Sequence, residues 1–208
     1  MGCSCERVTE RQAITGQTRI VARQARARGV TIALVTKTIT ARWSSASNFD
    51  AVSDGDGGHV QLAGDEGEVG YRPMTLLLTA LAACAGMDVI SICHKKRQGV
   101  MRYDVVVSGE QRPGSPRTFA TIAVEHRFEG GTVEPSAVRR AIELSATQYC
   151  PVSAHLSQGN VTISHRYRIS GISGDDGDHA AEVVVTGPNG AGLAPSRADA
   201  ASWAVQGR

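Results

Sequence analysis

The sequence has few aromatic residues, little net charge and no paired-cysteine motif, and each absence excludes a class of protein. Aromatic side chains make up 4% of the 208 residues, so stacking platforms for bases or sugars are scarce. Lys plus Arg total 22 and Asp plus Glu total 20, a net charge of +2. Dedicated nucleic-acid-binding proteins usually carry a strongly basic surface. We therefore expect no nucleic-acid partner.

The N-terminal segment MGCSCERVTERQ has neither the apolar run nor the cleavage site of a secretory signal, which favours a cytoplasmic location. The chain has five cysteines and no C-x-x-C motif. In that compartment, cysteines are more often buried, metal-binding or catalytic than bridged. A metal site at Cys3 and Cys5 is an alternative, but no histidine lies nearby. We expect an exposed chain end there, and no resident metal or cofactor.

One segment, from Met74 to Cys93, is apolar and long enough to raise the question of a membrane span. Asp88 lies inside it, and an aspartate near the centre of a bilayer costs about 2.5–3.5 kcal/mol. The flanking segments look like strands of a globular domain. The segment is therefore interpreted as a buried core helix, and no membrane partner is expected.

The hydrophobic pattern alternates between strands and two long helices. Period-two alternation predicts strands at 30–43, 59–62, 101–111, 118–130 and 160–169. One helix is predicted from Pro73 to just before Gly99. The second covers 135–150, is interrupted by Pro151 and restarts through 152–156. This order predicts an α+β domain in which an antiparallel sheet covers helices on one side.

Two flanking segments are expected to lie outside that domain. Residues 1–34 carry many arginines and little apolar content, so they are interpreted as a basic, flexible N-terminal extension. Residues 170–208 are rich in Gly and Asp and are interpreted as a flexible tail, with at most an isolated strand at 181–185. The predicted domain is 35–169.

The residues that could carry chemistry are two thiols, one in each helix. Cys84 lies in the middle of the first helix, and Cys150 lies at the interruption of the second. Packed helices could bring the two Cα atoms within disulfide range, about 4.4–6.8 Å, although spacing alone does not establish this. A thiol pair suits a peroxide-reducing cycle, whereas unpaired cysteines are more often small buried hydrophobes. Asp88 lies one turn beyond Cys84, and Cys93 faces the opposite side and is predicted to pack in the core.

Three segments together resemble the OsmC/Ohr family over about 35–169. They are RPMTLLLTALAACAGMDVISICHKKR, YDVVVSGEQRPGSPRTFATIAVEHRFEG and AIELSATQYCPVS. In that family a proline begins the central helix and the peroxidatic cysteine lies about eleven residues later, as Pro73 and Cys84 do here. Within the family, the sequence most resembles the branch whose central helix starts P-M-x-L-L-L and has M-D-V after the cysteine.

The resemblance implies a fold and an activity. The fold is an intertwined homodimer in which antiparallel sheets wrap two long central helices. The activity is thiol-dependent hydroperoxide reduction, with organic hydroperoxides favoured and an external dithiol or lipoylated protein as reductant. By the same resemblance, Cys84 is peroxidatic and Cys150 is resolving. The alternative is a non-catalytic OsmC-like small-molecule-binding or stress protein whose thiols are only packed.

The sequence departs from the family where the thiol is activated. Well-studied members hold a glutamate directly after the helix-opening proline, and here that residue is Met74. The activating arginine after the first strand is replaced by serines and an alanine at 44–47. The candidate substitutes are Arg42, Arg72 and Asp88.

Overall fold

The computed structural model describes residues 25–27, 30–32, 35–64, 67–172, 178–188 and 192–193. The chain divides into two compact units, residues 1–72 and 73–208. This division falls inside the single domain that the sequence predicted over 35–169.

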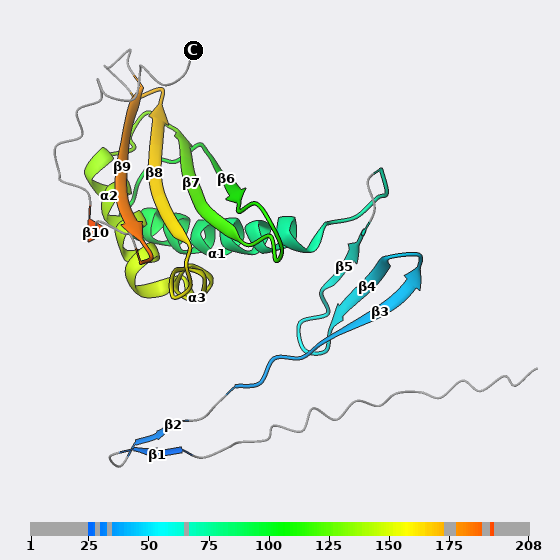
Figure 1. The fold of residues 1–208 in the computed structure, drawn as a ribbon. Helices are drawn as coiled ribbons and strands as arrows, with labels where there is room; N and C mark the ends of the chain where they lie inside the picture. Colours follow the sequence, from blue (N-terminus) through cyan, green and yellow to red (C-terminus); the bar gives the residue numbers. More distant parts are fainter. Residues whose placement is uncertain are drawn as a thin grey trace, which may run out of the picture. The chain divides into compact units, whose positions relative to one another are not determined.

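The first unit contains two small antiparallel sheets. β1 (Ala25–Ala27) pairs with β2 (Val30–Ile32), and a second sheet has the order β3-β4-β5 (Figure 1). The three strands of that sheet are β3 (Ile39–Ser45), β4 (Asn48–Ser53) and β5 (His59–Leu62). Every side chain of β3 is exposed. The predicted N-terminal extension otherwise lies outside the described residues.

The single strand predicted over 30–43 is wrong in its extent, because β2 and β3 occupy only parts of it. The register explains where β3 begins. Ile39 pairs with Ser53, and directly after Ser53 the chain turns, with the Ser53 N–H donating to the Gly58 carbonyl at 2.9 Å. Residues before Ile39 therefore have no continuing partner on β4, a strand that the sequence analysis did not predict.

The second unit opens with the helix predicted at Pro73. α1 (Pro73–Lys95) begins at that proline, whose missing N–H costs nothing in a first helical turn, and His94 and Lys95 occupy its last turn. One side of α1 packs in the core through the fully buried side chains of Leu81, Ala85, Val89 and Cys93. Met87, which points away from this core, is 70% exposed.

By length and composition alone, α1 also satisfies the criterion for a membrane span, with a hydropathy of 2.1 over its most apolar window. Core helices of soluble proteins pass the same test, so it carries little weight. The buried side of α1 packs against side chains of the sheet, including Val124 and Phe128. This packing agrees with the predicted core helix.

A five-stranded sheet of order β10-β9-β8-β7-β6 lies over the helices (Figure 1). Its strands are β6 (Arg102–Gln111), β7 (Phe119–Glu129), β8 (Thr162–Ser170), β9 (His179–Thr186) and β10 (Gly192–Leu193). The predicted antiparallel sheet is wrong at one pairing, because β7 and β8 run parallel, with Val124 opposite His165. The long helical connection between them permits this, since parallel neighbours need a crossover.

The second predicted helix is three consecutive segments. They are α2 (Pro135–Leu144), a π-helical turn η1 (Ser145–Tyr149) and α3 (Pro151–Ser157). Cys150 lies between the last two in an extended conformation, with φ −74° and ψ 101°. The residue before a proline is disfavoured in the helical region, which explains the predicted interruption and restart.

The flexible tail predicted from residue 170 is wrong over β9. This strand pairs with β8 along its length, and Val183 and Val184 are buried in the core. The Gly- and Asp-rich composition around residues 171–178 belongs to the connection that joins two paired strands. Residues 194–208 of the predicted tail lie outside the described part of the chain.

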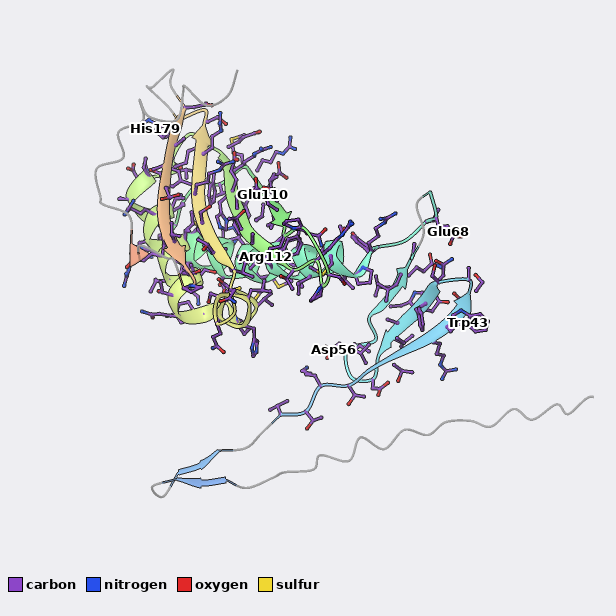
Figure 2. The ribbon with its side chains drawn as sticks, viewed as in Figure 1. Trp43, Asp56, Glu68, Glu110, Arg112 and His179 are labelled. Atoms are coloured by element: carbon purple, nitrogen blue, oxygen red, sulfur yellow. The ribbon has the colours of Figure 1, made fainter. Side chains whose placement is uncertain are left out.

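The sheet face opposite the helices is polar. Glu125 is 7% exposed there and accepts hydrogen bonds from Arg127 (3.0 Å) and Arg166 (2.7 Å), with Arg168 at 3.6 Å. Burial acts to raise the pKa of Glu125, but the two hydrogen-bonded guanidiniums hold it below its ordinary value. Figure 2 labels Glu110 and Arg112 near the end of β6; their partners are Thr121 and the Asn160 carbonyl.

Candidate active site

The two thiols that the sequence singled out lie together in the second unit. The Sγ atoms of Cys84 and Cys150 and a carboxylate oxygen of Asp88 are all within 4.8 Å of one another. Cys84 and Asp88 come from adjacent turns of α1, and Cys150 comes from the junction of η1 and α3. The side chain of Cys84 is half-buried, whereas Cys150 is 3% exposed.

Asp88 is oriented by a serine that the sequence analysis missed. The Ser145 hydroxyl, 1% exposed, donates to Asp88 Oδ2 at 3.1 Å. Ser145 is the first residue of η1, so the same irregular turn that positions Cys150 also supplies this contact. In the sequence, Ser145 lies among apolar residues on the core-facing side of the predicted helix. A polar residue at such a position is the signal that could have identified it.

Cys150 acts as the N-cap of α3. The Ser153 N–H donates to Cys150 Sγ at 3.3 Å. Burial raises the pKa of Cys150 to about 12; the Ser153 N–H acts to lower it, and the neighbouring Cys84 and Asp88 act to raise it. The raised pKa favours the neutral thiol over the thiolate at Cys150. Its sulfur nevertheless faces the sulfur of the more accessible Cys84.

The Ser145 contact leads to a stability prediction. Replacing Ser145 with alanine should lower the free energy of unfolding by about 1–3 kcal/mol, because a half-buried carboxylate loses its hydroxyl donor. Urea denaturation followed by circular dichroism measures the change. Ser157 is a matched control, since its exposed hydroxyl donates only to the Ala154 carbonyl. Ser157→Ala should change the value by less than about 0.5 kcal/mol. Equal effects of the two substitutions would contradict the role given to Ser145.

Cys93, the other cysteine of α1, lies apart from this cluster. It is fully buried and packs with Val89, Phe128 and Val133. Burial raises the pKa of its thiol to about 11, with Lys96 acting to lower it. The prediction that Cys93 packs in the core is confirmed.

A second group missed from the sequence is a pair of buried histidines. His126 and His165 are 0% and 1% exposed, and their rings stack with centroids 6.1 Å apart. Nδ1 of His126 shares a hydrogen bond of 2.7 Å with the Tyr103 hydroxyl. Both ring nitrogens of His165 lack a hydrogen-bond partner among the described residues. The histidines occupy core-facing positions of the alternating strands, but the parallel pairing that brings them together had no local signal.

Two of the proposed activators stay predictions. Arg42 lies on β3 and Arg72 directly precedes α1, and both side chains are exposed. They belong to the first unit, whereas both thiols belong to the second. The third candidate, Asp88, belongs to the same unit as the thiols and lies beside them.

Comparison with known proteins agrees with this fold. The family model described as OsmC-like protein matches residues 64–166, a range that contains both thiols and Asp88. Protein YhfA of Escherichia coli (strain K12) is 33% identical over 129 residues, which is 62% of this chain and 94% of YhfA.

Three solved structures with the same fold differ in how similar their sequences are to this chain. A hypothetical protein from Aquifex aeolicus VF5 is 29% identical, with a TM-score of 0.56 over 66% of this chain and 100% of that one. An OsmC-like protein from Mycoplasma pneumoniae is 18% identical, with a TM-score of 0.57 over 65% and 97%. An organic hydroperoxide resistance protein from Legionella pneumophila is 16% identical, with a TM-score of 0.51 over 67% and 100%. The α+β fold, the matched range and the similarity to YhfA together show that the chain belongs to the OsmC-like protein family.

Proposed function

We propose that this protein is a thiol-dependent hydroperoxide reductase that protects against oxidative stress. The observation that carries the proposal is the meeting of Cys84 and Cys150, from different helices, with their sulfurs within 4.8 Å. Two cysteines that only fill the core are not expected to lie against each other beside a carboxylate. The family also includes a protein named for organic hydroperoxide resistance, which supports the same substrate class.

The chemistry needs only these two sulfurs, a hydroperoxide and an external dithiol. The Cys84 thiolate attacks the terminal peroxide oxygen, the O–O bond breaks, and the alcohol leaves with a proton. Cys84 becomes a sulfenic acid. The Cys150 sulfur then attacks the Cys84 sulfur and releases water, which leaves a disulfide. A dithiol, free or carried as a lipoyl group on a protein, reduces the disulfide and returns both thiols.

The difference in exposure assigns the two roles. A peroxide arriving from solvent meets the half-buried Cys84 before Cys150, which is 3% exposed. Thiol reactivity toward oxidants follows access as well as thiolate character. We therefore assign Cys84 as the peroxidatic residue and Cys150 as the resolving residue, as the family resemblance implied.

Asp88 is proposed as a proton acceptor for this site. Its carboxylate lies within 4.8 Å of both sulfurs and is held by Ser145, so it can take the proton that Cys150 loses and pass it to the hydroxyl that leaves Cys84 as water when the disulfide forms. Arg42 and Arg72 stay candidates for the cation that would stabilise the Cys84 thiolate.

The assembly and location proposed from the sequence are a homodimer in the cytoplasm. The exposed Met87 side chain on the apolar helix α1 supports the dimer, because an apolar helix is expected to be covered on more than one side. No partner chain is needed to bring Cys84, Cys150 and Asp88 together, since all three belong to one unit of one chain.

The proposal is tested by peroxide consumption with a dithiol reductant. Purified protein should reduce an organic hydroperoxide faster than hydrogen peroxide when the two are run side by side. After mild peroxide without reductant, a peptide map should show a disulfide between Cys84 and Cys150. Folded protein that consumes neither peroxide, or that keeps both thiols reduced, would favour the non-catalytic small-molecule-binding alternative.

A further inference from the structure

We propose that reduced Cys84 and Cys150, together with Asp88, form a binding site for a thiophilic divalent cation, with Zn²⁺ as the best fit. The sequence predicted no metal site here, because the three residues are far apart in the chain and no C-x-x-C motif joins them. The fold supplies two sulfur donors and one oxygen donor at one point. The inference is independent of the proposed peroxidase activity.

The spacing of the donor atoms suits a small tetrahedral ion. All three lie within 4.8 Å of one another. Zinc bound to sulfur at about 2.3 Å and to carboxylate oxygen at about 2.0–2.2 Å would place its ligand atoms about 3.5–3.8 Å apart. The approach needed is at most about 1.3 Å, which small side-chain rotations can supply. Three protein ligands would leave the fourth position for water.

Neighbouring groups already orient two of the three donors. Ser145 donates to Asp88 Oδ2 at 3.1 Å, so Oδ1 can bind the cation while the carboxylate keeps its direction. The Ser153 N–H donates to Cys150 Sγ at 3.3 Å, as amide groups do to metal-bound thiolates. Such outer contacts fix ligand geometry and strengthen metal binding.

Charge and donor type favour the same class of ion. Once both thiols have lost their protons, two thiolates and a carboxylate within 4.8 Å would repel one another, and a cation between them would offset that repulsion. Sulfur ligands select borderline or soft ions such as Zn²⁺ over Mg²⁺ or Ca²⁺, which prefer oxygen alone. Binding would release protons from the thiols, and so it should weaken as pH falls.

Metal binding and disulfide formation exclude each other at this site. When a hydroperoxide oxidises the pair, two thiols and one hydroperoxide give a disulfide, an alcohol and water, and both sulfur ligands are lost. The bound cation is then released. The same ion, when bound, covers the sulfur that a peroxide would reach.

Cobalt(II) is the probe for the test, because its spectrum reports sulfur ligands and tetrahedral geometry. Untagged, full-length, reduced protein carrying Cys3→Ser and Cys5→Ser removes the N-terminal thiols from the measurement. One Co²⁺ per chain should give sulfur-to-cobalt charge-transfer bands and intense d–d bands, and Zn²⁺ should displace it. Cys84→Ser or Cys150→Ser should weaken binding by about 100-fold or more, and Asp88→Asn by about 10-fold. Cys93→Ala is the matched control and should bind normally.

Several outcomes would overturn the proposal. They are the absence of charge-transfer bands, bands that survive both cysteine substitutions, or bands lost only with Cys93→Ala. Should the further substitutions prevent folding, the Cys3→Ser and Cys5→Ser protein itself decides: Zn²⁺ should slow alkylation of Cys84, and the same protein oxidised to the disulfide should bind no Co²⁺. Equal alkylation rates with and without Zn²⁺ would refute the site, whatever the peroxidase assay shows.

Discussion

Replacing Cys84 with serine is expected to abolish hydroperoxide reduction, by on the order of 10³-fold or more, because a serine hydroxyl cannot replace a thiolate as the attacking group. Replacing Cys150 with serine is expected to leave the first step intact. In the absence of reductant, the wild-type chain should consume one peroxide and form the disulfide. Cys150→Ser should consume one peroxide and retain a sulfenic acid on Cys84, which dimedone traps.

The matched control for this pair is Cys93→Ala, which removes a buried thiol of the same helix from a different part of the core. It should consume peroxide at the wild-type rate, and circular dichroism should show all three variants folded. A burst of peroxide consumption in Cys84→Ser, with trapped sulfenic acid on Cys150, would reverse the two roles. A burst in both serine variants would show that neither thiol is specifically peroxidatic.

The buried histidines make the fold sensitive to acid. Burial, with a smaller contribution from His165, lowers the pKa of His126 from 6.5 to about 3, and burial lowers that of His165 from 6.5 to about 4. Below pH 6.5 the two histidines bind protons in the unfolded chain, whereas in the folded chain they stay neutral. Their stabilising contribution is therefore complete above pH 6.5 and is lost as pH falls toward 4. Between pH 7 and pH 5 the free energy of unfolding should drop by about 2 kcal/mol for each histidine.

Urea denaturation at pH 7 and pH 5, at one protein concentration, measures this drop. His165→Leu removes the ring whose nitrogens have no partner among the described residues and keeps a similar volume. It should reduce the drop by about half. His155→Gln is the control, because His155 is exposed on α3, and it should leave the drop unchanged. An unchanged drop in His165→Leu would mean that this histidine is protonated in the folded protein.

Much of the second unit could be predicted from the sequence because its signals are local. Pro73 begins α1, Pro151 interrupts the second helix at the expected place, and alternation marks β6, β7 and β8. The two thiols were identified as a candidate pair from their places in these helices. Their contact, however, needed the packing of α1 against η1 and α3, which no local pattern encodes.

The features that the sequence did not predict depend on pairings between distant segments. The parallel register of β7 and β8 brings His126 and His165 together. Taken alone, each histidine looks like a single polar residue among the apolar residues of its strand. The Ser145 contact with Asp88 spans 57 residues. The sequence predicts a tail over β9, because the residues before it are rich in Gly and Asp and its own apolar run is short. Pairing with β8 buries that apolar run in the core.

The π-helical turn before Cys150 has a consequence for which changes in chain length the protein tolerates. A π turn already holds one residue more than an α turn, so inserting a further residue within 145–149 would rotate everything after it by about 100°, whereas deleting one residue would only restore a regular α turn. With the insertion, Cys150 would leave its place opposite Cys84 although no side chain at the site had changed. Insertions should therefore be accepted in the turn at 112–118 and rejected in these five residues, where the number of residues determines whether Cys150 lies opposite Cys84.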